Sequence, residues 1–185
     1  SGAAVTSKAW ALEYSAPNAI IDELEKAIQD VKLYSLQLRP HSLDQLGLIP
    51  AVKHLVSSLN KTHQDVSITF ASSDISNRLL PIFEINLYRI IQEALHNALK
   101  YSQATLIEVI LYKEDGELVL IIQDDGIGFE RGLTEEGLGF KHMKERVDQM
   151  DGSLRIHSAL QSGTTIKVKV QDKEGKESDQ GIAGR

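Results

Sequence analysis

The stretch IFEINLYRIIQEALHNALKY, residues 82–101, follows Pro81 and has the periodicity of one long helix. Its apolar face is formed by Leu87, Ile91, Ala94, Leu95 and Ala98. A second face is polar and is formed by Glu93, Asn97, Lys100 and Tyr101. Side chains three and four residues apart share one face of a helix. The sequence therefore predicts a core helix that brings a carboxylate, an amide and an amine together.

Such a trio can serve a magnesium nucleotide. The amide oxygen of Asn97 is a hard ligand for Mg²⁺, and the ammonium group of Lys100 neutralises phosphate charge. The carboxylate of Glu93 can orient or activate a nucleophile. The commoner explanation of such a face is a solvated surface with one i,i+4 pair, so the spacing alone does not decide between the two.

Three further short motifs follow along the chain, and each of them has an ordinary structural explanation. DDGIGF, residues 124–129, leaves a very apolar strand, where a carboxylate can accept the exocyclic amine of adenine and glycines let a ligand approach the backbone. GLG, residues 137–139, precedes a predicted helix whose free amides suit phosphate. SGTT, residues 162–165, enters the last predicted strand. Taken singly, these are a turn, a helix entry and a hairpin.

The rest of the pattern predicts an α+β fold. Strands are expected over 65–71, 105–113, 117–123, 153–159 and 164–171. Glu114-Asp115-Gly116 predicts a hairpin, while helices are expected from about Pro50 to 60 and over 140–150. Hairpins with helices gathered between them favour a mixed, largely antiparallel sheet that is covered by helices on one face.

Together, in this order, the four motifs make the stretch 89–171 resemble the catalytic domain of histidine kinases, within the GHKL superfamily of gyrase, Hsp90-type chaperones and MutL-type repair proteins. The resemblance implies a Bergerat-type ATP-binding sandwich that uses ATP and Mg²⁺. It implies that Asn97 ligates Mg²⁺ and that Glu93 is the acidic residue that polarises the acceptor. It further implies that Asp124 binds the adenine amine and that Thr164 supports this site. The remaining ATP-binding residues that it implies lie around the phosphates, the ribose and the lid: Lys100, Tyr101, Gly126, Gly128, Gly137, Leu138 and Gly139. The sequence departs from the family pattern at Phe140 and His142, where an aliphatic and a small residue are expected.

The upstream part resembles one class of these kinases. Helices are predicted over 3–14 and 18–38, and the second has nearly heptad apolar spacing, which favours a helical bundle over a helix lying on its own domain. Residues 36–50 (LQLRPHSLDQLGLIP) resemble the linker of the nitrate-sensor/DesK-like class, which is homodimeric and acts on response regulators with LuxR-type output domains. None of the six histidines lies in the acidic context of a phosphoacceptor. We therefore expect the acceptor histidine to lie outside this chain.

These patterns divide the 185 residues into four parts. Residues 1–40 are the expected partial dimerisation helices, 41–60 the linker and first catalytic helix, 61–171 the ATP-binding domain, and 172–185 a disordered tail. The net charge of −6 argues against nucleic acid as a partner, and no apolar run is long enough to span a membrane. The absence of cysteine excludes disulfides and fits a cytoplasmic location.

Two other functions remain open from the sequence. One is a serine kinase of the anti-sigma type, a partner-switching module of the same superfamily. The other is a non-catalytic interaction module in which the helix over 18–38 serves for dimerisation alone.

Overall fold

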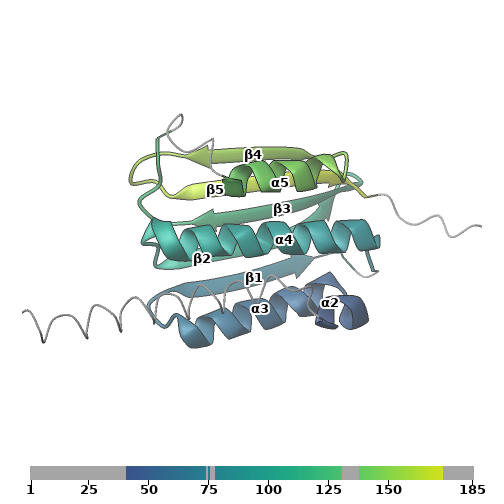
Figure 1. Ribbon diagram of the computed structural model, residues 1–185, viewed down its shortest axis with the longest axis horizontal. Coiled ribbons are helices and arrows are strands. Elements are labelled where there is room, and N and C mark those ends of the chain that lie inside the picture. The colour runs from purple at the N-terminus through teal and green to yellow at the C-terminus, as the bar shows by residue number, and fades with distance from the viewer. Residues whose placement is uncertain (1–40, 74, 76–77, 131–137, 173–185) are drawn as a thin grey trace, which may run out of the picture. The chain divides into compact units, whose positions relative to one another are not determined.

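The computed structural model describes residues 41–73, 75, 78–130 and 138–172 (Figure 1). The helices predicted over 3–14 and 18–38 lie outside these residues, as does the predicted tail from residue 173 onward.

A single five-stranded sheet forms one layer of the described domain. Its strands are β1 (Ser67–Ser73), β2 (Leu106–Glu114), β3 (Glu117–Asp124), β4 (Ser153–Ser158) and β5 (Thr164–Gln171). Their order across the sheet is β1-β2-β3-β5-β4. β1 runs parallel to β2, and all other neighbours are antiparallel. The predicted mixed, largely antiparallel sheet is confirmed.

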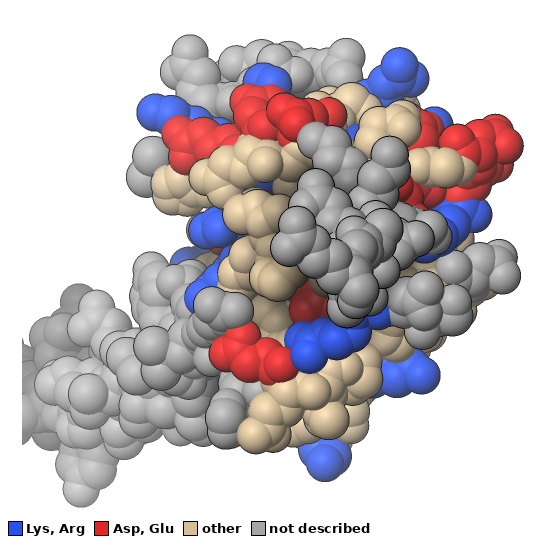
Figure 2. All heavy atoms as spheres, turned by 90° about the vertical axis from the view of Figure 1, so that its right-hand side faces the viewer, with Lys and Arg blue, Asp and Glu red and all other residues tan. Residues whose placement is uncertain are grey.

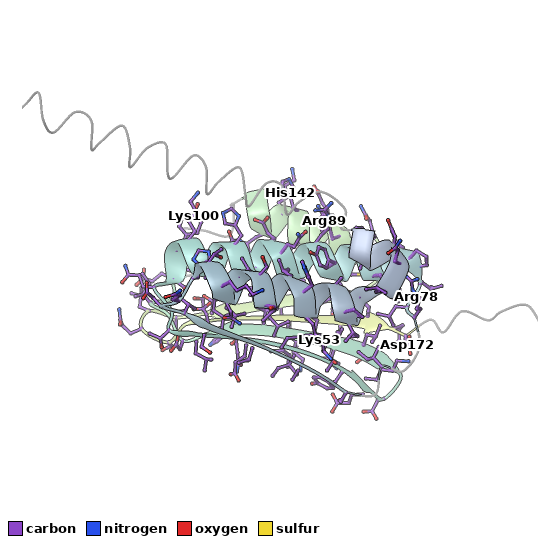
Figure 3. The ribbon with its side chains drawn as sticks, turned by 90° about the horizontal axis from the view of Figure 1, so that it is seen from below. Lys53, Arg78, Arg89, Lys100, His142 and Asp172 are labelled. Atoms are coloured by element: carbon purple, nitrogen blue, oxygen red, sulfur yellow. The ribbon has the colours of Figure 1, made fainter. Side chains whose placement is uncertain are left out.

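Helices form the second layer, on one face of the sheet (Figures 1 and 3). They are α2 (His41–Leu46), α3 (Leu48–Thr62), α4 (Pro81–Asn97) and α5 (Leu138–Asp148), and a π-helical turn, η1 (Ala98–Ser102), follows α4. Gly47 separates α2 from α3 with a φ of 85°, a left-handed value that favours glycine. The two-layer α+β architecture agrees with the sequence prediction.

The crossover from β1 to β2 places the functional residues. Parallel neighbours need a connection that returns the chain to the starting end of the sheet, and α4 provides it. The sequence had predicted both strands but not this β1-α4-β2 unit. α4 therefore ends where β2 begins. Because β3 is antiparallel to β2, its last residue, Asp124, arrives at the same end and pairs with Ile107.

The core lies between the two layers. All five residues of the predicted apolar stripe on α4 are buried, as are Ile107, Val109 and Leu111 on β2. The strand residues alternate between the covered face and the open one, as expected for a sheet packed on one side. Burial of one such aliphatic side chain contributes about 1.5–3 kcal/mol, so this interface fixes the position of α4 on the sheet.

The outer edge of β1 is closed by one side chain from α3. The amide of Asn60 donates to the carbonyl oxygen of Ile68 at 2.8 Å and accepts from its backbone nitrogen at 2.9 Å. Asn60 thus satisfies backbone groups that an unpaired edge strand leaves available for pairing with another chain.

Replacing Asn60 with alanine is expected to lower the free energy of unfolding by about 1–3 kcal/mol, because two partly buried backbone groups lose their partner. Urea denaturation measures this difference. Lys61→Ala is the control, since Lys61 is exposed on the same helix. Equal stabilities of the two variants would show that the two hydrogen bonds of Asn60 contribute nothing to the free energy of unfolding.

The end of the domain where α4 begins is closed by an arginine. Arg78 donates to the carbonyl oxygens of Leu43 and Asp44 at 2.9 and 3.0 Å, and it pairs with the buried carboxylate of Glu84 at 3.0 Å. Figure 2 looks onto this end, where acidic side chains gather over the upper part with basic ones between them. Arg78 therefore holds α2 against the first turn of α4.

Among the described residues, no helix is long and apolar enough to cross a membrane.

Candidate nucleotide site

The carboxyl-terminal part of α4 meets the start of α5. The side-chain nitrogen of Asn97 lies 3.4 Å from Oε1 of Glu93. A Cβ atom added to Gly139 would lie 2.3 Å from that same carboxylate oxygen and 3.2 Å from the Asn97 nitrogen. A larger residue at 139 would displace the Glu93 carboxylate. Gly139, the last residue of the motif GLG at 137–139, is therefore packed directly against Glu93 and Asn97 of the predicted polar stripe.

Beyond Asn97 the helix widens into the π-helical turn η1, which the sequence had predicted as a continuation of the α-helix. Ser102 Oγ donates to the carbonyl oxygen of Ala98 at 2.7 Å and accepts from the nitrogen of Ala104 at 3.1 Å. Gln103 then ends the turn in a left-handed conformation. A π-turn holds more residues than an α-turn, so the side chains after Asn97 leave the helical stripe that was predicted for them.

Lys100 and Tyr101 consequently lie at the exposed end of the helix. Tyr101 is 63% exposed, and the Nζ atom of Lys100 lies 5.5 Å from the centre of its ring. Lys100 projects from the end of the helix layer, away from the sheet (Figure 3). The structure thus places both residues beside Asn97 along the chain but at the rim of the site.

The first glycine motif, DDGIGF at residues 124–129, packs against the same π-turn. The nitrogen of Ile127 donates to the carbonyl oxygen of Ser102 at 2.7 Å. A Cβ atom at Gly126 would lie 2.2 Å from that oxygen. This approach requires glycine at 126, and it fixes the loop after β3 to the end of α4.

The last motif, SGTT at residues 162–165, packs against the first glycine motif, DDGIGF at residues 124–129. Gly128 and Gly163 have left-handed φ values of 59° and 69°. A Cβ atom at Gly128 would lie 2.1 Å from the backbone oxygen of Ala159, and one at Gly163 would lie 1.9 Å from the backbone oxygen of Asp124. The nitrogen of Gln161 donates to the oxygen of Ile127 at 2.7 Å. The loops 124–129 and 159–164 therefore form one tightly packed unit.

Asp124 is the half-buried carboxylate of this unit. Burial is the main cause that raises its pKa above the ordinary value, while hydrogen bonds from Gly126 and Thr164 act in the opposite direction. The amide of Gly126 donates to Oδ1 of Asp124 at 3.0 Å, and Thr164 stands directly opposite Asp124 in the β3–β5 register. An acceptor held in this way can bind a donor such as an exocyclic amine.

Asp125, the next residue, has a different role that the sequence analysis missed. Its carboxylate accepts from the backbone nitrogens of Leu106 and Thr105 at 2.9 and 2.8 Å and from the Thr105 hydroxyl at 2.7 Å. The hydrogen bond from Leu106 is the largest cause that lowers its pKa. Asp125 anchors the loop to the start of β2. No residue pattern distinguishes the two neighbouring aspartates, because the distinction depends on the direction in which each side chain leaves the strand end.

Ser158 is a second residue that the sequence analysis missed. Its side-chain oxygen accepts from the nitrogen of Phe129 at 3.0 Å, and it lies 3.0 Å from the carbonyl oxygen of Gly163 and 3.1 Å from the hydroxyl of Thr164. The residue is 8% exposed. A serine at a strand end has no distinguishing pattern, so nothing in the sequence could have singled it out.

The two departures from the family pattern occupy different surroundings. Phe140 contacts Phe129, with ring centres 5.7 Å apart. His142 is exposed on α5 and points away from the sheet (Figure 3). Phe129 and Phe140 also line a cavity of about 900 Å³ between α5 and β4. None of the described residues predicted to bind nucleotide lines this cavity.

The predicted residues therefore converge at one end of the sheet. Glu93 and Asn97 meet Gly139, and Asp124 meets Gly126 and Thr164. Gly137 lies outside the described residues, and of Leu138 only the backbone position, the first of α5, is described.

The chain matches known families over this same region. Residues 83–174 match the family described as "Histidine kinase-, DNA gyrase B-, and HSP90-like ATPase". The oxygen sensor histidine kinase NreB of Staphylococcus carnosus is 34% identical over 152 residues, which cover 80% of this chain and 43% of that protein. The histidine-protein kinase/phosphatase DegS of Bacillus subtilis is 37% identical over 138 residues, which cover 71% and 36%. The chain thus spans less than half the length of these relatives.

Solved structures show the same fold. The histidine kinase domain of the blue-light activated kinase from Erythrobacter litoralis EL346 superposes with a TM-score of 0.59 at 16% identity, covering 66% of this chain and 60% of that one. These relatives are histidine kinases, and nothing among them supports the serine-kinase alternative. The chain therefore belongs to the family of histidine kinase-, DNA gyrase B- and HSP90-like ATPases.

Proposed function

We propose that this chain is the nucleotide-binding part of a sensor histidine kinase, which donates the γ-phosphoryl group of ATP to a histidine outside this chain. From there the group passes to an aspartate of a response regulator. The observation that carries the proposal is the convergence of the described parts of four separate motifs at one end of the sheet. There Gly126 and Gly163 pack against backbone oxygens too closely for any side chain, and Gly139 lies against the carboxylate of Glu93.

In this proposal Asp124 accepts a hydrogen bond from the 6-amino group of adenine. Its carboxylate is half-buried and already carries donors from the protein, so it is held in one orientation. Thr164 supports it from the facing strand. Gly126 and Gly128 shape the loop beneath the base, and Gly137, Leu138 and Gly139 form the entry to α5, whose amides suit phosphate.

The polar residues of α4 are assigned to the phosphates. Asn97 directs its side-chain nitrogen toward Glu93, which leaves its amide oxygen available as a hard ligand for Mg²⁺. Lys100 and Tyr101 at the rim suit the phosphate and ribose side. Glu93 is assigned the orientation and polarisation of the accepting group. The protein then contributes mainly positioning and electrostatic stabilisation, as expected for phosphoryl transfer.

The donor set fits a magnesium ion that arrives with its nucleotide. Among the described residues, no group of three or more His, Cys, Asp or Glu side chains could hold a metal ion. Mg²⁺ is usually bound through few protein ligands together with substrate phosphates, and one amide oxygen from Asn97 is consistent with this. When bound, the ion would neutralise charge on the transferred phosphoryl group.

The wider assignments extend to the intact protein. We propose that residues 1–40 belong to its dimerisation helices and that 41–60 and 61–171 form the linker and catalytic domain. We further propose that the intact protein works as a homodimer and that the part given by this chain lies in the cytoplasm. The regulator would carry a LuxR-type output domain. The support for these points is the resemblance of residues 36–50 to the linker of that class, together with the histidine kinases NreB and DegS among the relatives.

Calorimetric titration of the 185-residue chain tests the proposal. We expect the chain to bind ATP and ADP, with affinity strengthened by Mg²⁺, and Asn97→Ala to remove the magnesium-dependent part, about 1–3 kcal/mol for a lost ligand to a charged centre. Asn86→Ala is a matched control, because Asn86 lies on the same helix and contacts Gln149 instead. An Asn97→Ala variant whose affinity still responds fully to Mg²⁺ would point to a non-catalytic module.

The acceptor is tested separately with radiolabelled ATP. The chain alone is expected to form no acid-labile phosphate, and addition of a histidine-bearing dimerisation helix is expected to produce it on that helix. Acid-labile phosphate on one of the six histidines of this chain would contradict the assignment of the acceptor.

A further inference from the structure

The helices α4 and α5 lie side by side in the helix layer and run antiparallel to one another (Figure 1). Gly139, near the start of α5, lies against Glu93 in the last part of α4. Gln149, directly after α5, accepts from the side-chain amide of Asn86, near the start of α4, at 3.2 Å. These two contacts fix which residues face one another along the seam between the two helices.

This alignment brings Arg89 of α4 and Arg146 of α5 to the same part of the seam. Arg89 lies one turn after Asn86, and Arg146 lies one turn before Gln149. Burial is the largest cause that lowers the pKa of Arg89, and the like charge of Arg146 is the next. Figure 3 shows Arg89 on the side of the helix layer that faces away from the sheet. The structure thus holds two positive charges close together on the outer side of the helices.

Neither arginine has an acidic partner in the part of the chain that the structure describes. Arg89 donates to the neutral side-chain oxygen of Gln92 at 3.0 Å, and none of the ion pairs between described side chains includes Arg89 or Arg146. Acidic residues outnumber basic ones in the chain by 26 to 20, so carboxylates are not scarce. Both arginines are only partly exposed, which limits the screening of their repulsion by salt. An anion from outside the domain would offset this repulsion.

We propose that Arg89 and Arg146 together bind one carboxylate of the protein that carries the acceptor histidine, and so align that histidine with Glu93. The inference rests on the function proposed above, in which Glu93 polarises the accepting group. A guanidinium group is planar and forms paired hydrogen bonds with the two oxygens of a carboxylate. Two such groups on one side of a helix seam therefore suit a single carboxylate.

The place of the pair along α4 favours the acceptor protein over the nucleotide as the source of this anion. Arg89 precedes Glu93 by four residues and Asn97 by eight, which is about 6 and about 12 Å along the helix axis at about 1.5 Å per residue. The residues assigned to the nucleotide continue in the opposite direction, from Asn97 to Asp124 at the end of the sheet. A partner helix whose histidine reaches Glu93 can place a carboxylate about one turn away, against the arginines.

Transfer from radiolabelled ATP to the histidine-bearing dimerisation helix of the preceding section tests this inference. In the 185-residue chain, Arg89→Ala and Arg146→Ala are each expected to raise the KM for this helix about tenfold, the equivalent of one hydrogen bond to a charged group. The kcat and the affinity for ADP, measured by calorimetry, should stay near their wild-type values. Because both arginines contact one carboxylate, the double variant should raise KM by less than the product of the two single effects.

Lys53→Ala is the matched control. Lys53 is an exposed basic residue on α3, and α3 lies on the far side of α4 from α5 (Figure 1). Removal of this positive charge should change neither the KM for the acceptor helix nor the affinity for ADP. A rise in KM equal to that of the arginine variants would mean that the total charge of the chain attracts the acceptor and that no particular site does.

A charge reversal provides a readout that a purely structural role would not change. Arg89→Glu is expected to raise the KM about 100-fold, because like charges then face one another across the interface. Replacing the acidic residues of the acceptor helix near its histidine with lysine, one at a time, should identify one position that restores most of the lost affinity. Arg146→Glu gives the same test from the other helix if the first variant does not fold.

Rescue at none of these positions, or a wild-type KM in both alanine variants, would overturn the inference while normal ADP binding and transfer left the proposed function intact. An equal loss of ADP affinity and of acceptor affinity would place the pair in the nucleotide site and would also overturn it. A wild-type chain that binds ADP but transfers no phosphate to the acceptor helix would instead refute the proposed function.

Discussion

Replacing Asp124 with asparagine is expected to weaken ADP binding about 100-fold, the equivalent of a charge-assisted hydrogen bond to a buried group. The amide keeps the size of the carboxylate but loses its charge, and one end of it now presents donors to the adenine amine. Calorimetric titration with ADP at pH 7 measures the loss.

The same substitution is expected to stabilise the unliganded chain. Burial raises the pKa of Asp124, so the folded state holds its proton more tightly than the unfolded state does. The contribution of this group to stability therefore rises as the pH falls through the folded pKa, and above that pKa the ionised group is unfavourable. A neutral asparagine removes this penalty at pH 7. Urea denaturation of both proteins should show the variant more stable at pH 7 and the difference shrinking toward acid pH.

Asp115→Asn provides the control for both effects. Asp115 is an exposed residue in the β2–β3 turn with a φ of 50°, a conformation that asparagine also adopts readily. It should change neither ADP affinity nor stability. An Asp124→Asn variant that binds ADP like the wild type would remove Asp124 from the proposed site. A loss of stability at pH 7 would instead show that its hydrogen bonds outweigh the cost of burying it.

Replacing Gly163 with alanine is expected to lower the free energy of unfolding by about 3 kcal/mol or more, because overpacking and left-handed strain add together. A Cβ atom at 163 would lie 1.9 Å from the carbonyl oxygen of Asp124, which is backbone and cannot turn aside. Gly163 also has a φ of 69°. Relief of this clash must separate the last motif from Asp124, so ADP binding should be lost even where the variant still folds.

Gly116→Ala separates the two causes. Gly116 has a similar φ of 78° in the other hairpin, but a Cβ atom there meets nothing within 4 Å. It should therefore lose only the strain, about 1 kcal/mol, with ADP affinity unchanged. Denaturation curves that show equal losses for Gly116→Ala and Gly163→Ala would mean that the junction between the two loops yields easily and does not define the site.

The sequence predicted most of the elements because hydrophobic periodicity and turn residues mark them. The alternation of Ile166, Val168 and Val170 marked β5, and Pro81 marked the start of α4. The pairing of β1 with β2 could not be predicted in this way. Periodicity identifies a strand but not its neighbour, and a parallel partner lies a whole helix away in the chain.

The candidate site was predicted to a similar extent. Asn97, Asp124 and the glycines lie in recognisable motifs. The structure brings those of these residues that it describes to one end of the sheet. The π-turn after Asn97 was missed because an α-helix is the default for the same residues. Ser158 was missed because its role arises from contacts with loops that are distant in sequence.

The most direct test of the account is a crystal structure of the chain with Mg²⁺ and a non-hydrolysable ATP analogue. We predict the adenine amine within hydrogen-bond distance of the Asp124 carboxylate and Mg²⁺ bound to the amide oxygen of Asn97. A nucleotide seated instead in the cavity between α5 and β4, beside Phe129 and Phe140, would contradict the assignment of the site.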